Sequence, residues 1–314
     1  MELWQQLCIQ AGVRSNAKGV RTVLQGVIPA IVTPTRNQRV SLPELELYVR
    51  WVVDQGVQGL YAFGTTGEGV LIPDVDWAEA VRTVVMAAAG RVPVVVQCGG
   101  ISLHQTQGRI AQAVASGVDG IAVVAPYFYH YGDEAVRAYY QEIVSSWPTV
   151  KVYLYNIPAY SHNDIAPGVY QQIAQDYSNV VGIKDSSGNP QRLQAYLDAV
   201  PGRAVLTGSD ALYETAYGMG ATGVVTGVGA ALPSLAVAAW NGLKQGDARM
   251  ADRVNQVQQA FHRYSTIQSA RVVLAASGFA VGESFRPLLG LVATDQEELL
   301  QSLAKLGIEL PGDK

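Results

Sequence analysis

Cysteine is almost absent from this chain of 314 residues, which contains only Cys8 and Cys98. Their spacing fits neither a disulfide framework nor a cysteine-rich metal site, so we expect a reducing, cytoplasmic compartment. Histidine is also scarce: the chain has His104, His130, His162 and His262. No two of them combine ligand spacing with a nearby acid, which disfavours a metal-dependent mechanism.

Positive charge and long apolar runs are lacking too. The net charge is −4 at pH 7 and no basic cluster occurs, so we expect no nucleic-acid partner. No stretch is apolar for long enough to span a membrane. Residues 1–25 lack an apolar run followed by a cleavage site of small residues, so we expect no signal peptide. These absences favour a soluble cytoplasmic enzyme that acts on small molecules.

The chain does contain eight short apolar or β-branched runs at fairly regular intervals. Their apolar residues do not alternate with polar ones, which is typical of parallel strands covered on both faces. The runs are residues 26–33, 59–64, 92–98, 120–125, 151–156, 180–184, 204–207 and 223–226.

Segments with helical periodicity lie between these runs, for example residues 78–89 and 102–116. Eight such strand–helix units predict a closed (β/α)8 barrel; the alternative is an open, doubly wound sheet. After Pro233 only helical patterns continue. We therefore expect an N-terminal extension over residues 1–25, a barrel over residues 26–232 and helices packed on it over residues 233–314.

Lys184 is one of only six lysines, and it ends an apolar strand. In a barrel, the carboxyl ends of the strands form the active face. Loss of hydration there lowers the pKa of an amine and leaves it nucleophilic, which indicates Schiff-base chemistry. The alternative from the strand position alone is a structural lysine paired with Asp185 or another carboxylate.

Two other strand ends carry candidate groups. The segment Gly64-Thr65-Thr66-Gly67 offers hydroxyls and accessible N–H groups that could hold a carboxylate or phosphate, although an ordinary turn is the alternative. Tyr155 ends another strand and could transfer protons if its phenol faces the same mouth. Core packing is the more common role of such a tyrosine.

Together, these segments resemble the family that contains dihydrodipicolinate synthase and N-acetylneuraminate lyase. The resemblance covers roughly residues 25–310 and rests on four motifs at strand ends. They are GTTGE at 64–68, YNIP at 155–158, GIKDSSG at 182–188 and GSD at 208–210. It implies a (β/α)8 barrel that acts on pyruvate and an aldehyde through a lysine imine, without a cofactor, as a homotetramer or homodimer.

The resemblance also assigns roles to individual residues. Lys184 resembles the imine-forming lysine, and Tyr155 resembles the general acid and base. Thr65 and Thr66 resemble the pair that holds the keto-acid carboxylate and relays protons to Tyr155. Gly64 belongs to the same binding turn.

Three departures from the family pattern bear on the substrate. Tyr160 stands where the synthases carry an arginine for the aldehyde's carboxylate, and Phe128 stands where they carry a tyrosine that is lent to a neighbouring subunit. Ala211 replaces the acid that sialic-acid lyases carry after the aspartate matching Asp210. Both named activities are therefore disfavoured.

We expect a lyase that cleaves a 2-keto-3-deoxy sugar acid, or a related 2-keto acid, to pyruvate and an aldehyde. The alternatives through the same imine are dehydration of a deoxy-keto acid and a synthase-type condensation; another is a non-catalytic keto-acid sensor. From their strand-end positions, we place six residues around the variable end of the substrate. They are Tyr160, His130, His162, Ser209, Asp210 and Thr226.

Overall fold

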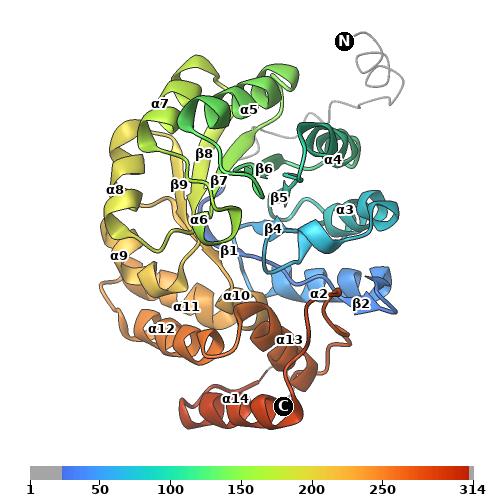
Figure 1. Ribbon diagram of the computed structural model, residues 1–314. Helices are drawn as coiled ribbons and strands as arrows, with labels where there is room; N and C mark the ends of the chain where they lie inside the picture. The colour runs from blue at the N-terminus through green and yellow to red at the C-terminus, as the bar shows by residue number, and fades with distance from the viewer. Residues whose placement is uncertain (1–22, 311–314) are drawn as a thin grey trace.

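Eight parallel strands form a barrel at the centre of the computed structural model, which describes residues 23–310 (Figure 1). Each of the eight predicted runs overlaps one of them, and only β8 extends past its run, by one residue. They are β1 (Gly26–Pro29), β4 (Leu60–Ala62), β5 (Val94–Gln97), β6 (Gly120–Val124), β7 (Val152–Asn156), β8 (Val180–Asp185), β9 (Ala204–Thr207) and β10 (Gly223–Thr226).

The sheet closes on itself. Its hydrogen-bonded order runs β1-β10-β9-β8-β7-β6-β5-β4, and a parallel bridge between Ala30 and Tyr61 joins the first strand to the last. The predicted closed barrel is therefore confirmed, and the open doubly wound sheet is excluded. Closure brings the carboxyl ends of all eight strands to one mouth.

Alternation along each strand decides which side chains fill the barrel. On β7, Val152 and Leu154 pack outward against the helices, whereas Tyr153 and Tyr155 belong to the interior cluster with Tyr61. The amide of Leu24 donates to the Tyr153 hydroxyl at 2.8 Å near the start of this strand. Successive side chains of a strand point to opposite faces, so each strand supplies both layers.

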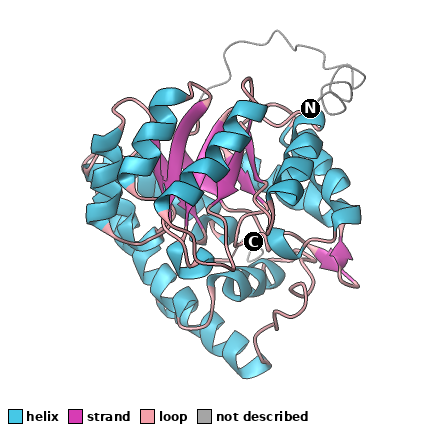
Figure 2. Cartoon of the chain, turned by 45° about the horizontal axis from the view of Figure 1, so that its top comes forward, coloured by secondary structure: helices cyan, strands magenta, loops and turns pink. Residues whose placement is uncertain are grey.

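Helices surround the barrel, as Figure 2 shows. The principal ones that follow the strands in turn are α2 (Leu42–Asp54), α3 (Asp74–Ala88), α4 (Leu103–Ala115), α5 (Asp133–Ser146), α7 (Pro167–Asp176), α8 (Pro190–Ala199), α9 (Tyr213–Gly218) and α11 (Pro233–Lys244). Short helices follow two strand ends, α6 (Pro158–Ser161) and α10 (Val228–Ala231). A small antiparallel hairpin of β2 (Thr35–Arg36) and β3 (Arg39–Val40), which the sequence patterns did not predict, follows β1.

The C-terminal part of the chain is helical, as predicted. It contains α12 (Arg249–His262), α13 (Thr266–Ala276) and α14 (Ala293–Lys305), which pack against one another beside α10 and α11 (Figure 1). The N-terminal extension expected over residues 1–25 lies mostly outside the described residues, as do residues 311–314. Within residues 23–310, no helix has the length and apolar character needed to cross a membrane.

Candidate active site

Lys184 projects into the barrel near the carboxyl end of β8. Its backbone lies beside Tyr155 of β7 and Leu206 of β9 in the parallel register. The side chain is 4 % exposed, and Nζ lies 4.1 Å from the ring centroid of Tyr61 and 4.0 Å from that of Tyr155. The amine is thus held between two aromatic rings whose planes meet at 77°.

The surroundings of Lys184 favour its neutral form. Burial lowers its pKa from 10.5 to about 7, although the negative charge of Asp210 opposes this shift. The adjacent Asp185 is engaged elsewhere, because its carboxylate accepts hydrogen bonds from Asn156 Nδ2 at 2.9 Å and Ser187 Oγ at 2.7 Å. Loss of hydration therefore outweighs the nearby charge, and a large fraction of the amine is unprotonated at neutral pH.

Tyr155 faces the same interior and remains protonated at neutral pH. Burial raises the pKa of its phenol to about 12, although hydrogen bonds with Thr65 and Ser186 oppose the shift. The Thr65 hydroxyl lies 3.0 Å from the phenolic oxygen. A proton can therefore pass between the two hydroxyl groups without any large movement.

The turn that carries Thr65 and Thr66 has an unusual backbone. Phe63 before it and Glu68 within it both have positive φ angles, 58° and 53°. A Cβ added at Gly67 would lie 2.8 Å from the Ile31 carbonyl oxygen, so only glycine fits there. Such backbone strain persists only where the surroundings hold it, and it is frequent at functional sites.

Asp210 lies at the same mouth of the barrel, just after the end of β9. Its Oδ2 accepts hydrogen bonds from the amides of Gly227 and Val228, both at 2.9 Å, whereas its buried Oδ1 has no hydrogen-bond partner among the described residues. Burial raises the pKa of this carboxyl. A Cβ added at Gly227 would lie 3.6 Å from Asp210 Oδ2 and 3.8 Å from Thr66 Oγ1, which makes the two side chains neighbours.

The structure thus gathers Lys184, Tyr155, Thr65, Thr66 and Asp210 at one mouth of the barrel. Gly64 is buried in the same turn, where a Cβ would lie 2.6 Å from the Tyr61 ring. These positions agree with the strand-end expectation. Their roles in binding and catalysis stay predictions.

The other expected substrate residues are placed less centrally. Thr226 is buried, and its hydroxyl already accepts from the Gly229 amide at 2.8 Å; Ser209 is half-buried. Tyr160 is 67 % exposed but close enough to raise the pKa of Tyr155. His130 and His162 are exposed, and nothing in the structure links either to Lys184.

Sequence reasoning assigned no role to three residues that contact the central group. Tyr61 covers Lys184 with its ring, and its buried hydroxyl has no partner among residues 23–310. Ser186 shares a hydrogen bond with Tyr155. A Cβ added at Gly208 would overlap Ser186 Oγ and lie 2.9 Å from Lys184 Cε, so glycine makes room for both side chains. Inward alternation on β4 was the available signal for Tyr61.

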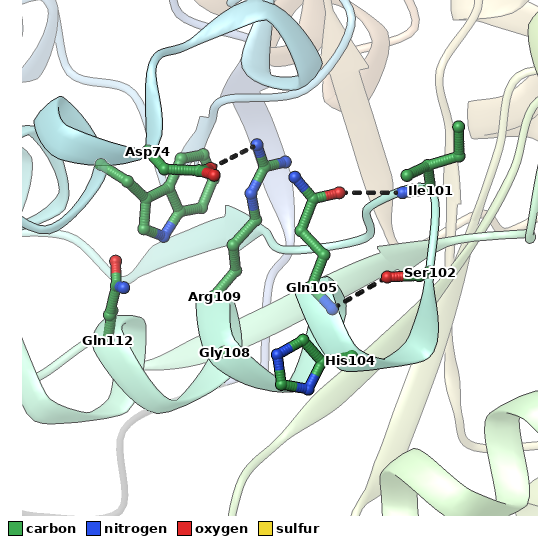
Figure 3. A pocket seen from close by; sticks show the side chains of 9 residues that line it. Asp74, Ile101, Ser102, His104, Gln105, Gly108, Arg109 and Gln112 are labelled. Atoms are coloured by element: carbon green, nitrogen blue, oxygen red, sulfur yellow. Dashed lines mark hydrogen bonds and ion pairs between the residues drawn. The ribbon is translucent and has the colours of Figure 1, made fainter.

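A separate cavity of about 360 Å³ lies outside the barrel, between α3 and α4. Figure 3 shows Arg109 and Asp74 on its walls, with Arg109 Nη2 3.6 Å from Asp74 Oδ1. The Arg109 guanidinium stacks on the Trp77 ring at 4.5 Å. None of the expected site residues lines this cavity. In residues 23–310, no group of three or more His, Cys, Asp or Glu side chains is arranged as metal ligands would be.

Comparison with curated proteins gives long matches. A DapA-like lyase of Halobacterium salinarum is 30% identical over 290 residues, which cover 91% of this chain and 95% of that protein. The 4-hydroxy-tetrahydrodipicolinate synthase of Methylococcus capsulatus is 28% identical over 292 residues, covering 91% of this chain and 100% of that protein.

Solved structures and family models agree with these matches. The crystal structure of dihydrodipicolinate synthase from Thermotoga maritima matches with a TM-score of 0.85 and 26% identity, covering 91% of this chain and 99% of that one. The model of the dihydrodipicolinate synthetase family matches residues 23–306. The chain therefore belongs to the dihydrodipicolinate synthetase family, whose members are lyases.

Proposed function

We propose that this protein cleaves a 2-keto-3-deoxy sugar acid, or a related 2-keto acid, to pyruvate and an aldehyde through an imine on Lys184. The observation that carries the proposal is the state of the Lys184 amine. It is buried between two tyrosine rings, is not taken up by Asp185, and has a pKa of about 7. A neutral amine in such a site attacks a carbonyl carbon.

The reaction begins when Lys184 Nζ adds to the C2 carbonyl of the keto acid. Loss of water then gives a protonated imine. This group draws electrons from the C3–C4 bond, which breaks as the C4 hydroxyl loses its proton and becomes the aldehyde. The electron pair stays on C3 as an enamine, which takes up a proton. Hydrolysis finally releases pyruvate and restores the amine.

Tyr155 accepts the proton of the C4 hydroxyl in this scheme. With its pKa at about 12, the phenol is a poor base in the free protein. Lys184 Nζ lies 4.0 Å from the centroid of the Tyr155 ring, so a protonated imine at this nitrogen places a positive charge beside the phenol. A neighbouring cation lowers the pKa of an acid, so imine formation itself activates Tyr155. Thr65, at 3.0 Å, relays the proton onward.

The keto-acid carboxylate binds at the turn that contains Thr65 and Thr66. The hydroxyls and backbone N–H groups of this turn can donate hydrogen bonds to an anion. The remaining substrate extends toward Ser209, Asp210 and Thr226 on one side and Tyr160 on the other, with His130 and His162 at the outer rim. Tyr160 provides no guanidinium for a carboxylate on the aldehyde, and Phe128 provides no hydroxyl to lend to a neighbouring subunit. A carboxylated aldehyde is therefore not the favoured partner.

Borohydride reduction in the presence of pyruvate tests the imine. The wild-type protein should gain the mass of a reduced pyruvate adduct, and peptide mapping should place it on Lys184. Lys184→Arg should abolish the adduct, whereas Lys244→Arg, on a helix outside the barrel, should leave it unchanged. An adduct that persists in Lys184→Arg would refute the mechanism.

A panel of 2-keto-3-deoxy acids then separates the possible reactions. Release of pyruvate indicates cleavage. A keto acid with an unbroken carbon chain indicates dehydration instead. Pyruvate binding without turnover of any panel member would indicate a keto-acid sensor.

A further inference from the structure

The turn with Thr65 and Thr66 is held from outside by a buried ion pair. Arg271 of α13 donates from Nε to Glu68 Oε1 at 2.8 Å, and its Nη2 lies 2.6 Å from the same oxygen. The Glu68 side chain is 0% exposed and the Arg271 side chain 6%. Glu68 ends the turn and Arg271 follows it by about two hundred positions, so the contact joins the barrel to the C-terminal helices.

The other polar atoms of the two side chains form hydrogen bonds with backbone groups. Arg271 donates to the carbonyls of Thr33 after β1 and of Val281 in the loop after α13, at 2.8 and 2.7 Å. Glu68 Oε2 accepts from the Phe285 amide at 2.7 Å. One guanidinium therefore fixes three parts of the chain to one another: the end of β1, the turn after β4 and the C-terminal loop.

The geometry transmits this restraint to the threonines. The Glu68 amide donates to the Thr65 carbonyl at 3.0 Å, and the Gly69 amide donates to the Gly64 carbonyl at 3.1 Å. Glu68 itself has φ of 53°, a conformation that a glutamate adopts only under constraint. A shift of its carboxylate would therefore move the backbone of Thr65.

Stability alone does not explain a buried ion pair. Well-packed apolar side chains of similar volume often stabilise a fold as well or better, because both charges lose their hydration on burial. The ion pair instead supplies directional contacts that fix one position of the turn. The contacts converge on the segment that receives the keto-acid carboxylate in the proposed function.

We propose that Glu68 and Arg271 are positioning residues that hold Thr65 and Thr66 in the geometry that binds the keto-acid carboxylate. This inference rests on the proposed function. It makes α13 and the loop after it part of the support that holds the binding turn in place.

The test measures borohydride trapping of pyruvate as a function of pyruvate concentration. Glu68→Gln and Arg271→Lys should raise the half-saturating concentration about tenfold or more, since small displacements of positioned groups cause losses of this size. The pH midpoint of trapping should not change, because neither residue contacts Lys184. Val254→Ala, a buried truncation in α12, serves as the control: it should lower stability to urea without changing the half-saturating concentration.

A double variant separates positioning from folding. Glu68→Met combined with Arg271→Met buries no unpaired charge, so it should be more stable to urea than either of the single methionine variants. It should nevertheless keep a raised half-saturating pyruvate concentration. Wild-type concentration dependence in this folded double variant would overturn the inference alone. Absence of any adduct in the wild-type protein would overturn the proposed function as well.

Discussion

The Asp210→Asn substitution tests what sets the reactivity of Lys184. Burial lowers the pKa of the amine to about 7, and the Asp210 carboxylate is the group that opposes this shift. Asparagine keeps the size of the side chain and can still accept from the amides of Gly227 and Val228. Removal of the charge alone should therefore lower the pKa of Lys184 further.

The size of the change follows from the amine's protonation. With a pKa of about 7, about half of the Lys184 amines are neutral at pH 7. Among fully hydrated lysine side chains, on the order of one amine in several thousand is neutral at that pH. An opposite charge at close range typically shifts a pKa by about 1–3 units. Asp210→Asn should therefore move the midpoint of amine reactivity down by at least about one pH unit.

The assay is the initial rate of pyruvate trapping between pH 5 and 9, roughly two units on either side of the expected midpoint. In the wild-type protein the rate should rise with pH through about 7 and then level off, because only the neutral amine attacks. Glu214→Gln, an exposed acid in α9, provides the matched loss of one charge and should leave the midpoint unchanged. An unchanged midpoint in Asp210→Asn would show that this carboxyl is already protonated, and it would refute the reasoning.

Three further predictions follow from the same geometry. Tyr155→Phe should leave trapping on Lys184 intact but lower the rate of pyruvate release from substrate by about 10²-fold or more, as measured by coupled product assay. Gly208→Ala should slow trapping, because the new Cβ would overlap Ser186 Oγ and lie 2.9 Å from Lys184 Cε, whereas Gly132→Ala, with no atom within 4 Å, should not. Lys184→Met should make the protein more stable to urea at pH 7, by at most about 4–5 kcal/mol. Between pH 7 and 10.5 the unfolded state binds the Lys184 proton more tightly than the folded state, so the stability of the wild-type protein should rise with pH in that window. The difference in unfolding free energy between Lys184→Met and the wild type should therefore shrink as the pH rises. A difference independent of pH would contradict the prediction.

The barrel could be predicted from the sequence because each of its elements leaves a local signal. Parallel strands buried on both faces read as short apolar runs, and each of the eight runs overlaps a strand of the barrel. The strand ends followed directly, and with them Lys184, Tyr155 and the Thr65–Thr66 turn. Bounds were less accurate at β1, where the run at 26–33 extends past the four-residue strand Gly26–Pro29.

The contacts across the barrel left no such signal. Tyr61 covers Lys184 from a strand more than a hundred positions earlier, and the pairing of Arg271 with Glu68 joins segments about two hundred positions apart. Nothing in the local pattern of either segment specifies its partner, because the pairing depends on how the closed barrel and the C-terminal helices meet. Asp210 shows the same limit: its strand-end position was predictable, but its charge effect on Lys184 was not.

Two opposing influences meet at the Lys184 amine. The Tyr61 and Tyr155 rings and the Asp210 carboxylate favour a positive charge, whereas the absence of water disfavours it. The pKa of about 7 means that the loss of hydration dominates in the free protein, so the amine is available as a nucleophile. In the proposed reaction, the protonated imine that replaces the amine carries its charge spread over carbon and nitrogen, and such a charge needs less hydration. Under the proposed function, the same rings and carboxylate stabilise this intermediate, which would explain why groups that favour a cation surround an amine that must begin neutral.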